Sequence, residues 1–222
     1  HLAKVDQSSV GTNWGVGDIM YADLDGDGKI SNGTNKLGDT GDYRIIGNST
    51  PRFKYGITLD AAWKGFDFSI FMQGIGKRDL WLDGCYFWGA NGQGNEWQST
   101  GFAEHWDFFR PEGDPLGANL NSYYPRVNFS GDRNTKVQTR YLQNGAYLRL
   151  KNVQLGYTLP RVWTEKAGIS SVRVYVSGDN LATITSLSKI FDPEATGSLA
   201  GTGSGKLYPL QRVISVGVNV NF

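Results

Sequence analysis

Apolar and polar residues alternate along five segments of this 222-residue chain. In the first segment every odd position from Phe53 to Trp63 is apolar, whereas Lys54, Thr58 and Asp60 stand between them. This period of two predicts β-strands with one apolar and one polar face, because successive side chains of a strand point to opposite sides. The segments are about as long as a tilted membrane strand, roughly 9 to 11 residues.

The other four segments extend this pattern. Lys64-Gly65 predicts a two-residue hairpin turn into the second strand, because glycine adopts positive φ without strain. A change of phase near Asn152 predicts a β-bulge in the third strand. Alternation alone leaves a soluble β-sandwich open, because one face of each of its sheets also packs in a core. In a membrane sheet, we expect one face to contact lipid through Ile57, Leu59, Ile70, Val174, Val176, Val216 and Val218.

Short and long connections alternate between the expected strands. Soluble domains seldom contain structureless loops of this size, whereas outer-membrane barrels have short periplasmic turns and long external loops. An open sheet edge in lipid is costly, so five strands predict a piece of something larger. We therefore expect an all-β fold, the C-terminal strands of a large antiparallel transmembrane β-barrel with long extracellular loops. The predicted order is a loop at 1–52, a hairpin at 53–76, a loop at 77–145, a hairpin at 146–181, a loop at 182–209 and a last strand at 210–222.

Composition narrows the functional classes. Lys and Arg total 22 against 21 Asp and Glu, which gives a net charge of +1 and argues against nucleic acid as a partner. Thirty glycines and 13% aromatic residues argue against disorder and against a helical bundle. A single cysteine excludes an intrachain disulfide framework. Because the chain starts without a methionine or a signal-peptide pattern, we expect a mature product or a fragment.

An Asp-Leu-Asp-Gly-Asp-Gly-Lys run places carboxylates at Asp23, Asp25 and Asp27. The spacing matches positions 1, 3 and 5 of a calcium-binding loop, in which the carbonyl of Lys29 would be a further ligand. A threonine stands where such a loop has its last carboxylate. Asp39 or Asp42 would supply it, and we favour Asp42 because it leads directly into the next strand-like segment. We predict a structural Ca²⁺ ion in an external loop; the alternative is a solvated acidic turn.

The predicted loop at 77–145 is rich in aromatic residues. Trp88, Trp97 and Trp106 are candidates for stacking on a substrate, with nearby amides as hydrogen-bond partners. A long external loop also needs a core of its own to be ordered, and this structural role is the interpretation that we favour.

Catalysis is not expected, because His1 and His105 are the only histidines and no nucleophile motif accompanies them. Arg149, Lys151 and Arg173 lie on the polar faces of their strands. They line the lumen of a barrel, contact a plug inside it, or form salt bridges.

As a set, several stretches resemble the SusC/RagA-like TonB-dependent transporters of the Gram-negative outer membrane. They are GDIMYADLDGDGKI, DYRIIGNSTPRFKYGITL, WKGFDFSIFMQGIGKRD, TRYLQNGAYLRLKNVQLGYTLP, VRVYVSGDNL, FDPEA and VISVGVNVNF. They follow one another over most of the chain, and the likeness weakens only at 80–136 and 197–205.

The resemblance implies a barrel of about twenty-two strands with an N-terminal plug. It implies import of large nutrients, oligosaccharides or peptides, together with a SusD-like surface lipoprotein. Energy would come from the TonB complex through an N-terminal part that this chain lacks. Phe222 resembles the signal that the barrel assembly machinery recognises. The alternative function is a secreted, calcium-stabilised β-sandwich that binds glycans.

Overall fold

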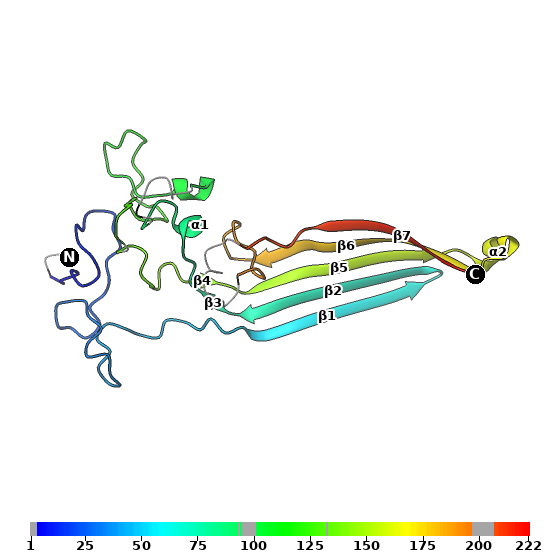
Figure 1. The fold of residues 1–222 in the computed structure, drawn as a ribbon, viewed down its shortest axis with the longest axis horizontal. Coiled ribbons are helices and arrows are strands. Elements are labelled where there is room, and N and C mark those ends of the chain that lie inside the picture. The colour runs from blue at the N-terminus through cyan, green and yellow to red at the C-terminus, as the bar shows by residue number, and fades with distance from the viewer. Residues whose placement is uncertain (1–3, 93, 95–100, 132, 197–206) are drawn as a thin grey trace. The chain divides into compact units, whose positions relative to one another are not determined.

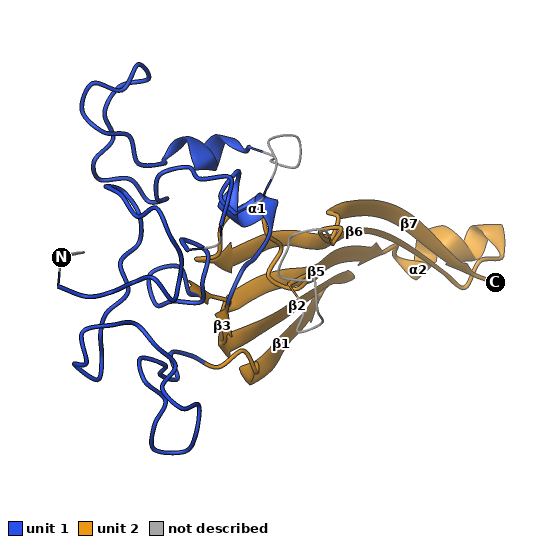
Figure 2. Cartoon of the chain, turned by 60° about the vertical axis from the view of Figure 1, so that its left-hand side comes forward, with its two compact units in different colours: residues 1–47, 81–142, 199–206 blue, residues 48–80, 143–198, 207–222 orange. Residues whose placement is uncertain are grey.

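The computed structural model describes residues 4–92, 94, 101–131, 133–196 and 207–222. The chain divides into two compact units, coloured separately in Figure 2. Unit 1 comprises residues 1–47, 81–142 and 199–206, and unit 2 comprises residues 48–80, 143–198 and 207–222. Unit 2 contains all the named strands, whereas the described part of unit 1 is mostly irregular chain.

Unit 2 is built on one antiparallel sheet (Figure 1). Each strand pairs with the next one in this sheet, so the sheet is a meander. The prediction of an all-β, antiparallel architecture is confirmed. In spatial order the strands are β1 (Arg52–Trp63), β2 (Phe66–Lys77), β5 (Tyr147–Thr158), β6 (Ser171–Thr185) and β7 (Val213–Asn221). A separate two-stranded ladder is formed by β3 (Asp79–Leu80) and β4 (Gln143–Asn144).

Short turns join the strands at one end of this sheet. Lys64 and Gly65 connect β1 to β2 with φ values of 48° and 87°, the positive pair that a tight hairpin turn requires. The predicted turn is therefore confirmed. Between β5 and β6 lie α2 (Arg161–Thr164) and the 3₁₀ turn η3 (Glu165–Ala167). The carboxyl end of β7 lies at the same end of the sheet, since β7 runs antiparallel to β6.

A bulge interrupts β5 where the sequence predicts one. The register shifts between Leu150 and Asn152, so Lys151 stands outside the ladder to β6. Opposite it, β6 supplies two unpaired residues, and one of them, Asn180, has a φ of 52°. The strand β6 continues past this bulge to Thr185, whereas the sequence predicts an end near 181.

The register brings the apolar residues of all five strands onto one face. One row across the sheet is Leu59, Ile70, Val153, Gly178 and Ile214, and the next is Ala61, Phe68, Leu155, Val176 and Val216. This face is open: Leu59 is 54% exposed, Val176 48% and Val216 72%. A β-sandwich would bury such a face under a second sheet. The sandwich alternative is therefore wrong for the described residues.

Unit 1 has an aromatic core in place of a sheet. Its regular elements are α1 (Cys85–Trp88) and the 3₁₀ turn η2 (Ala103–Trp106). Four rings pack edge-on or stacked at centroid distances between 4.8 and 6.3 Å: Phe87, Trp88, Tyr124 and Tyr141. Across the described part of the chain, no helix is long and apolar enough to cross a membrane.

Candidate functional site

The polar face of the sheet carries an ion pair that spans three strands. Arg173 on β6 donates through Nε (2.8 Å) and Nη2 to the carboxylate of Asp67 on β2. Gly156 on β5 lies between them, and a Cβ at this position would overlap both charged groups. The guanidinium also lies over the ring of Tyr175, 5.0 Å from its centroid. For Arg173, the salt-bridge interpretation is confirmed.

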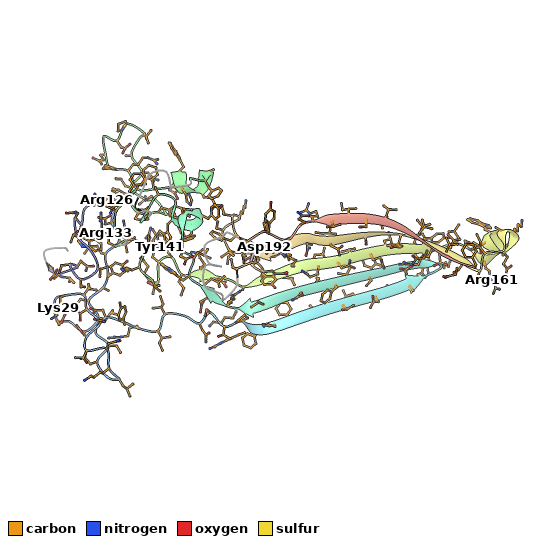
Figure 3. The ribbon with its side chains drawn as sticks, in the orientation of Figure 1. Lys29, Arg126, Arg133, Tyr141, Arg161 and Asp192 are labelled. Carbon is orange, nitrogen blue, oxygen red and sulfur yellow. The ribbon has the colours of Figure 1, made fainter. Side chains whose placement is uncertain are left out.

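The segment after β6 folds back onto this sheet through its Phe-Asp-Pro-Glu-Ala run. Arg149 donates to Asp192 at 2.7 Å, and Lys151 donates to Glu194 at 3.0 Å. Asp192, labelled in Figure 3, also accepts the amides of Glu194 (2.9 Å) and Leu210 (3.0 Å). Burial would raise the pKa of Asp192, but the Arg149 guanidinium and these two amides lower it overall. These contacts fasten the connection between β6 and β7 to the sheet.

A pocket of about 580 Å³ lies beside this ion-pair group. Lys54 and Tyr55 of β1 and Gln73 of β2 contribute to its lining, as do Tyr147 and Glu194. Every lining residue belongs to unit 2. The sequence gives no local signal for this pocket, because its walls come from four separate stretches of chain.

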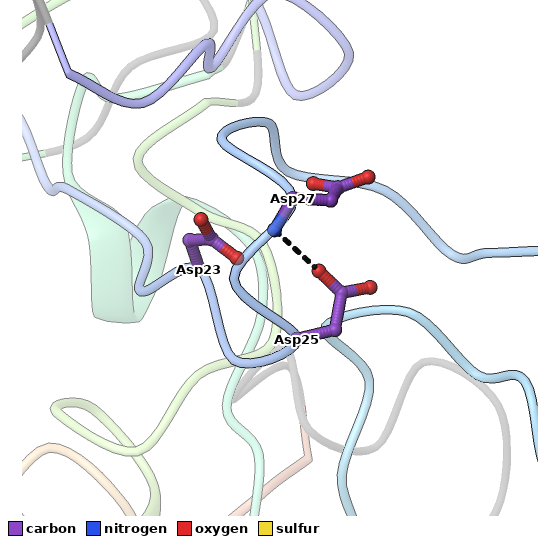
Figure 4. Close-up of side chains that lie close together, drawn as sticks. All are labelled: Asp23, Asp25 and Asp27. Carbon is purple, nitrogen blue, oxygen red and sulfur yellow. Dashed lines mark hydrogen bonds between the residues drawn. The ribbon is translucent and has the colours of Figure 1, made fainter.

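The three aspartates of the predicted metal loop lie close together (Figure 4). One carboxylate oxygen from each of Asp23, Asp25 and Asp27 lies within 4.8 Å of the others. The Asp27 amide lowers the pKa of Asp25 through its hydrogen bond, but desolvation and the charges of Asp27, Asp42 and Asp23 raise it overall. An oxygen-only donor set with mutual repulsion fits a hard cation such as Ca²⁺.

The other two predicted ligands have different surroundings. The carboxylate of Asp42 accepts hydrogen bonds from the amides of Leu24 (2.6 Å) and Ser31 (2.7 Å). Asp42 therefore holds the two ends of the loop together through their backbone amides. The ammonium of Lys29 lies 3.6 Å from Asp27 and partly balances its charge. The described carboxylate group therefore consists of the three alternating aspartates, and Asp42 supports the ends of their loop.

The three candidate tryptophans differ in position. Trp88 is only 3% exposed, and its indole N–H donates to the carbonyl of Leu82 at 3.1 Å. It is a core residue and offers little free surface for stacking. Trp106 is 59% exposed, and the guanidinium of Arg110 lies 5.5 Å from the centroid of the Trp106 ring. Trp97 lies outside the described residues.

His105 has a structural setting. Its Nδ1 accepts the amide of Phe102 (3.0 Å), which leaves Nε2–H to donate to the carbonyls of Tyr86 and Phe87 (3.1 Å each). Burial lowers the pKa of His105. The imidazole therefore joins two segments of unit 1 as a neutral side chain.

Asp18 is a buried junction that the sequence does not reveal. Its side chain is 1% exposed and accepts from Arg126 (2.7 Å), Arg133 (3.2 Å) and Asn134 (2.9 Å); both arginines are labelled in Figure 3. Burial would raise the pKa of Asp18, but the hydrogen bonds from Arg126, Asn134 and the Gly15 amide lower it overall. The partners lie more than 100 residues apart in the chain, so no local pattern signals them.

Comparison with known proteins shows relatives of one kind. The chain is 33% identical over 216 residues to TonB-dependent receptor P3 of Formosa agariphila, a match that covers 93% of this chain and 19% of that protein. It is 29% identical over 229 residues to TonB-dependent receptor P26 of the same organism, a match that covers 99% of this chain and 21% of that protein. The chain thus spans about a fifth of the length of these relatives. No protein-family model matches.

Solved structures agree with these relatives. The RagAB peptide importer in its closed-closed state matches with a TM-score of 0.64 and 26% identity, over 92% of this chain and 21% of that one. The open-open state of the same importer matches with a TM-score of 0.62 and 27% identity, over 81% of this chain and 18% of that one. These proteins are named as receptors or importers, not as enzymes.

Fold and sequence together identify the chain as a segment of a TonB-dependent receptor. Within that class it is SusC/RagA-like, because the RagAB structures share both its fold and more than a quarter of its residues over most of its length.

Proposed function

We propose that this chain forms part of the wall of an outer-membrane transporter that imports large nutrients, oligosaccharides or peptides. The observation that carries this proposal is the sheet with one exposed apolar face and one polar face that bears ion pairs. Such a sheet suits lipid on one side and an aqueous lumen on the other. Its outer strands, β1 and β7, would pair with further strands of the intact receptor, since unpaired backbone groups are costly in lipid.

The intact receptor would work with two protein partners. A SusD-like lipoprotein would cover the external mouth, and the TonB complex would deliver energy through the N-terminal part. The likeness to RagAB, named a peptide importer, supports this assembly and makes peptides one candidate cargo. Of the three candidate tryptophans, Trp106 is the described one with exposed surface for cargo, and it lies beside Arg110.

Deletion of the gene for the intact receptor tests the transport proposal. Cells would be supplied with defined oligosaccharides or peptides as the sole carbon or nitrogen source, and uptake would be measured. We expect the deletion to abolish uptake of at least one nutrient, restoration by the wild-type gene, and loss of the same uptake when TonB is disabled. Unchanged uptake of every nutrient tested would contradict the proposal.

Phe222 would serve as the recognition signal for the barrel assembly machinery. It follows β7 directly and is 90% exposed. Phe222→Ala should lower the amount of receptor in the outer membrane, as measured by immunoblot of membrane fractions. Phe53→Ala, which removes an exposed phenylalanine at the other edge strand, is the matched control.

A Ca²⁺ ion would stabilise the loop of Asp23, Asp25 and Asp27. Calorimetric titration of the metal-stripped full-length receptor should detect binding, because the cation relieves the repulsion that, after desolvation, contributes to the raised pKa of Asp25. Asp25→Asn should weaken binding, whereas Asp114→Asn, outside the loop, should not. An absence of binding, or equal binding by the Asp25 variant, would exclude this site.

A further inference from the structure

Four arginines are buried in the described part of the chain, and Arg78 differs from the other three. Arg133 and Arg149 face carboxylates. Arg110 donates to two backbone carbonyls. Arg78 is 6% exposed, and its side chain makes a single hydrogen bond to the described residues, from Nε to the carbonyl of Ser49 at 3.1 Å.

The guanidinium of Arg78 has no described counter-charge. Desolvation lowers the pKa of Arg78, yet an arginine in a protein stays protonated at neutral pH. A buried charge is normally paired, because its desolvation is costly. The described residues give neither Nη atom of Arg78 a hydrogen-bond partner. Arg78 lines the pocket, so a ligand bound there would lie next to this side chain.

The rest of the pocket favours an anion. Lys54 adds a second positive charge to the lining. The acidic residue of the lining, Glu194, is already held by Lys151 at 3.0 Å and by Arg149 at 3.5 Å. The described lining therefore carries a net positive charge.

Size and shape indicate a ligand larger than a lone ion. A volume of about 580 Å³ falls within the roughly 300 to 1,000 Å³ that small-molecule sites occupy. Tyr55, Phe71 and Tyr147 contribute aromatic surface to the lining. Apolar walls with a few polar groups are typical of sites that bind and orient organic molecules.

We infer that this pocket binds a carboxylate group of the imported solute, with Arg78 as the fork-shaped donor and Lys54 as a second cation. The planar guanidinium matches the two oxygens of a carboxylate. This inference rests on the proposed transport function and adds a substrate class to it, acidic oligosaccharides or acidic peptides. A single carboxylate side chain from elsewhere in the receptor would leave most of the pocket unfilled.

Calorimetric titration of the purified full-length receptor tests the inference with paired probes. One pair is an oligogalacturonate and its methyl ester, and the other is a tetrapeptide of glutamate and one of glutamine. The pairs separate a sugar acid from a peptide acid, and each acid has a neutral partner of similar shape. The variants are Arg78→Gln and Lys77→Gln; Lys77 is an exposed neighbouring cation outside the lining.

We expect at least one acidic probe to bind more tightly than its neutral partner. Arg78→Gln should weaken that binding by at least about tenfold, the effect of losing a charged hydrogen bond. Lys77→Gln should leave it within about twofold, as for an exposed charge. If Arg78→Gln misfolds by circular dichroism, Arg78→Lys keeps the charge without the fork and should weaken binding by a smaller factor.

Two results would overturn the inference. In the first, no acidic probe binds better than its neutral partner, or the Arg78 variant binds as tightly as wild type. In the second, Arg78→Gln lowers the unfolding temperature of the ligand-free receptor without changing probe binding, which means that another part of the receptor neutralises Arg78. Nutrient uptake that continues in either case would leave the transport function intact.

Discussion

Unit 1 and unit 2 keep their chains in place by different means. In unit 2 the strands are fixed by four backbone ladders, each made of many equivalent hydrogen bonds. The described part of unit 1 has only scattered backbone bonds between distant segments. It adds side chains that bind distant backbone, such as Tyr141 to the carbonyl of Tyr123 at 2.6 Å and Arg126 to that of Asn13 at 2.8 Å. Order in unit 1 should therefore depend on single residues, whereas order in unit 2 should not.

The two units also place their apolar residues differently. Unit 1 buries its largest rings, with Tyr141 at 0% and Phe87 at 1% exposed. Unit 2 turns a continuous apolar face outward. A water-soluble protein rarely exposes such a face. Buried rings suit a unit 1 that is surrounded by water, and an exposed apolar face suits a unit 2 that is surrounded by lipid.

The largest expected effect is at Asp18. Asp18→Ala leaves Arg133, which is nearly buried, without its described carboxylate partner, and removal of one partner from a buried ion pair costs about 3–5 kcal/mol. Hydrogen exchange of the full-length receptor should show faster exchange at Ile19, whose amide donates to Asn134 beside Asp18. Exchange in β5 and β6 should not change, and equal loss of protection there would show that the units are not held independently.

Lowering the pH should remove the ion pairs of Asp18 in the unaltered protein. Because the pKa of Asp18 is lowered in the folded state, its stabilisation is complete above the unfolded pKa of about 4 and is lost as the pH falls below it. Hydrogen exchange, corrected for its intrinsic pH dependence, should reveal opening around Ile19 below about pH 4. In Asp18→Ala this pH dependence should be weaker; an unchanged dependence would assign it to other carboxylates.

A charge on the apolar face should have the next largest effect. Val176→Lys should destabilise the membrane-embedded receptor by about 2–4 kcal/mol if Val176 lies near the membrane midplane. Ser177→Lys, on the opposite face of the same strand, is the control and should cost much less. Denaturant unfolding of the receptor in lipid vesicles measures both, and equal costs would argue against lipid on the Val176 face.

The smallest effect is expected at Tyr141. Tyr141→Phe keeps the ring in the core but removes the hydroxyl that donates to Tyr123, a loss of about 0.5–1.5 kcal/mol. Hydrogen exchange at the Tyr124 amide, which donates to the carbonyl of Asp107, should rise modestly. An effect as large as that of Asp18→Ala would mean that the ring itself has moved.

Sequence reasoning succeeded where the determining contacts are local. The period of two correctly placed Val176 and Val216 on the same face, and the change of phase predicted a bulge near Asn152, which the structure has at Lys151. It missed the extension of β6 past the two unpaired residues opposite Lys151. The sequence also indicated the cluster of Asp23, Asp25 and Asp27, because these residues lie within five positions of one another.

The remaining features depend on contacts between distant parts of the chain. Asp18 meets Arg126 across 108 residues, and the pocket of Arg78 joins β1 to the segment after β6. Composition placed Trp88 and Trp106 in the same aromatic region but did not indicate that one is buried and the other exposed. Only the folded chain distinguishes them.

The central claim is that the apolar face of the sheet meets lipid and the polar face meets water. Spin labels placed one at a time at positions 174 to 177 of the full-length receptor in vesicles, with Cys85 replaced by serine, test it directly. Collision rates with oxygen, which concentrates in lipid, should be high at Val174 and Val176 and low at Tyr175 and Ser177. Collision rates with a water-soluble nickel chelate should show the opposite order. Equal rates along the strand, or a reversed alternation, would contradict this account.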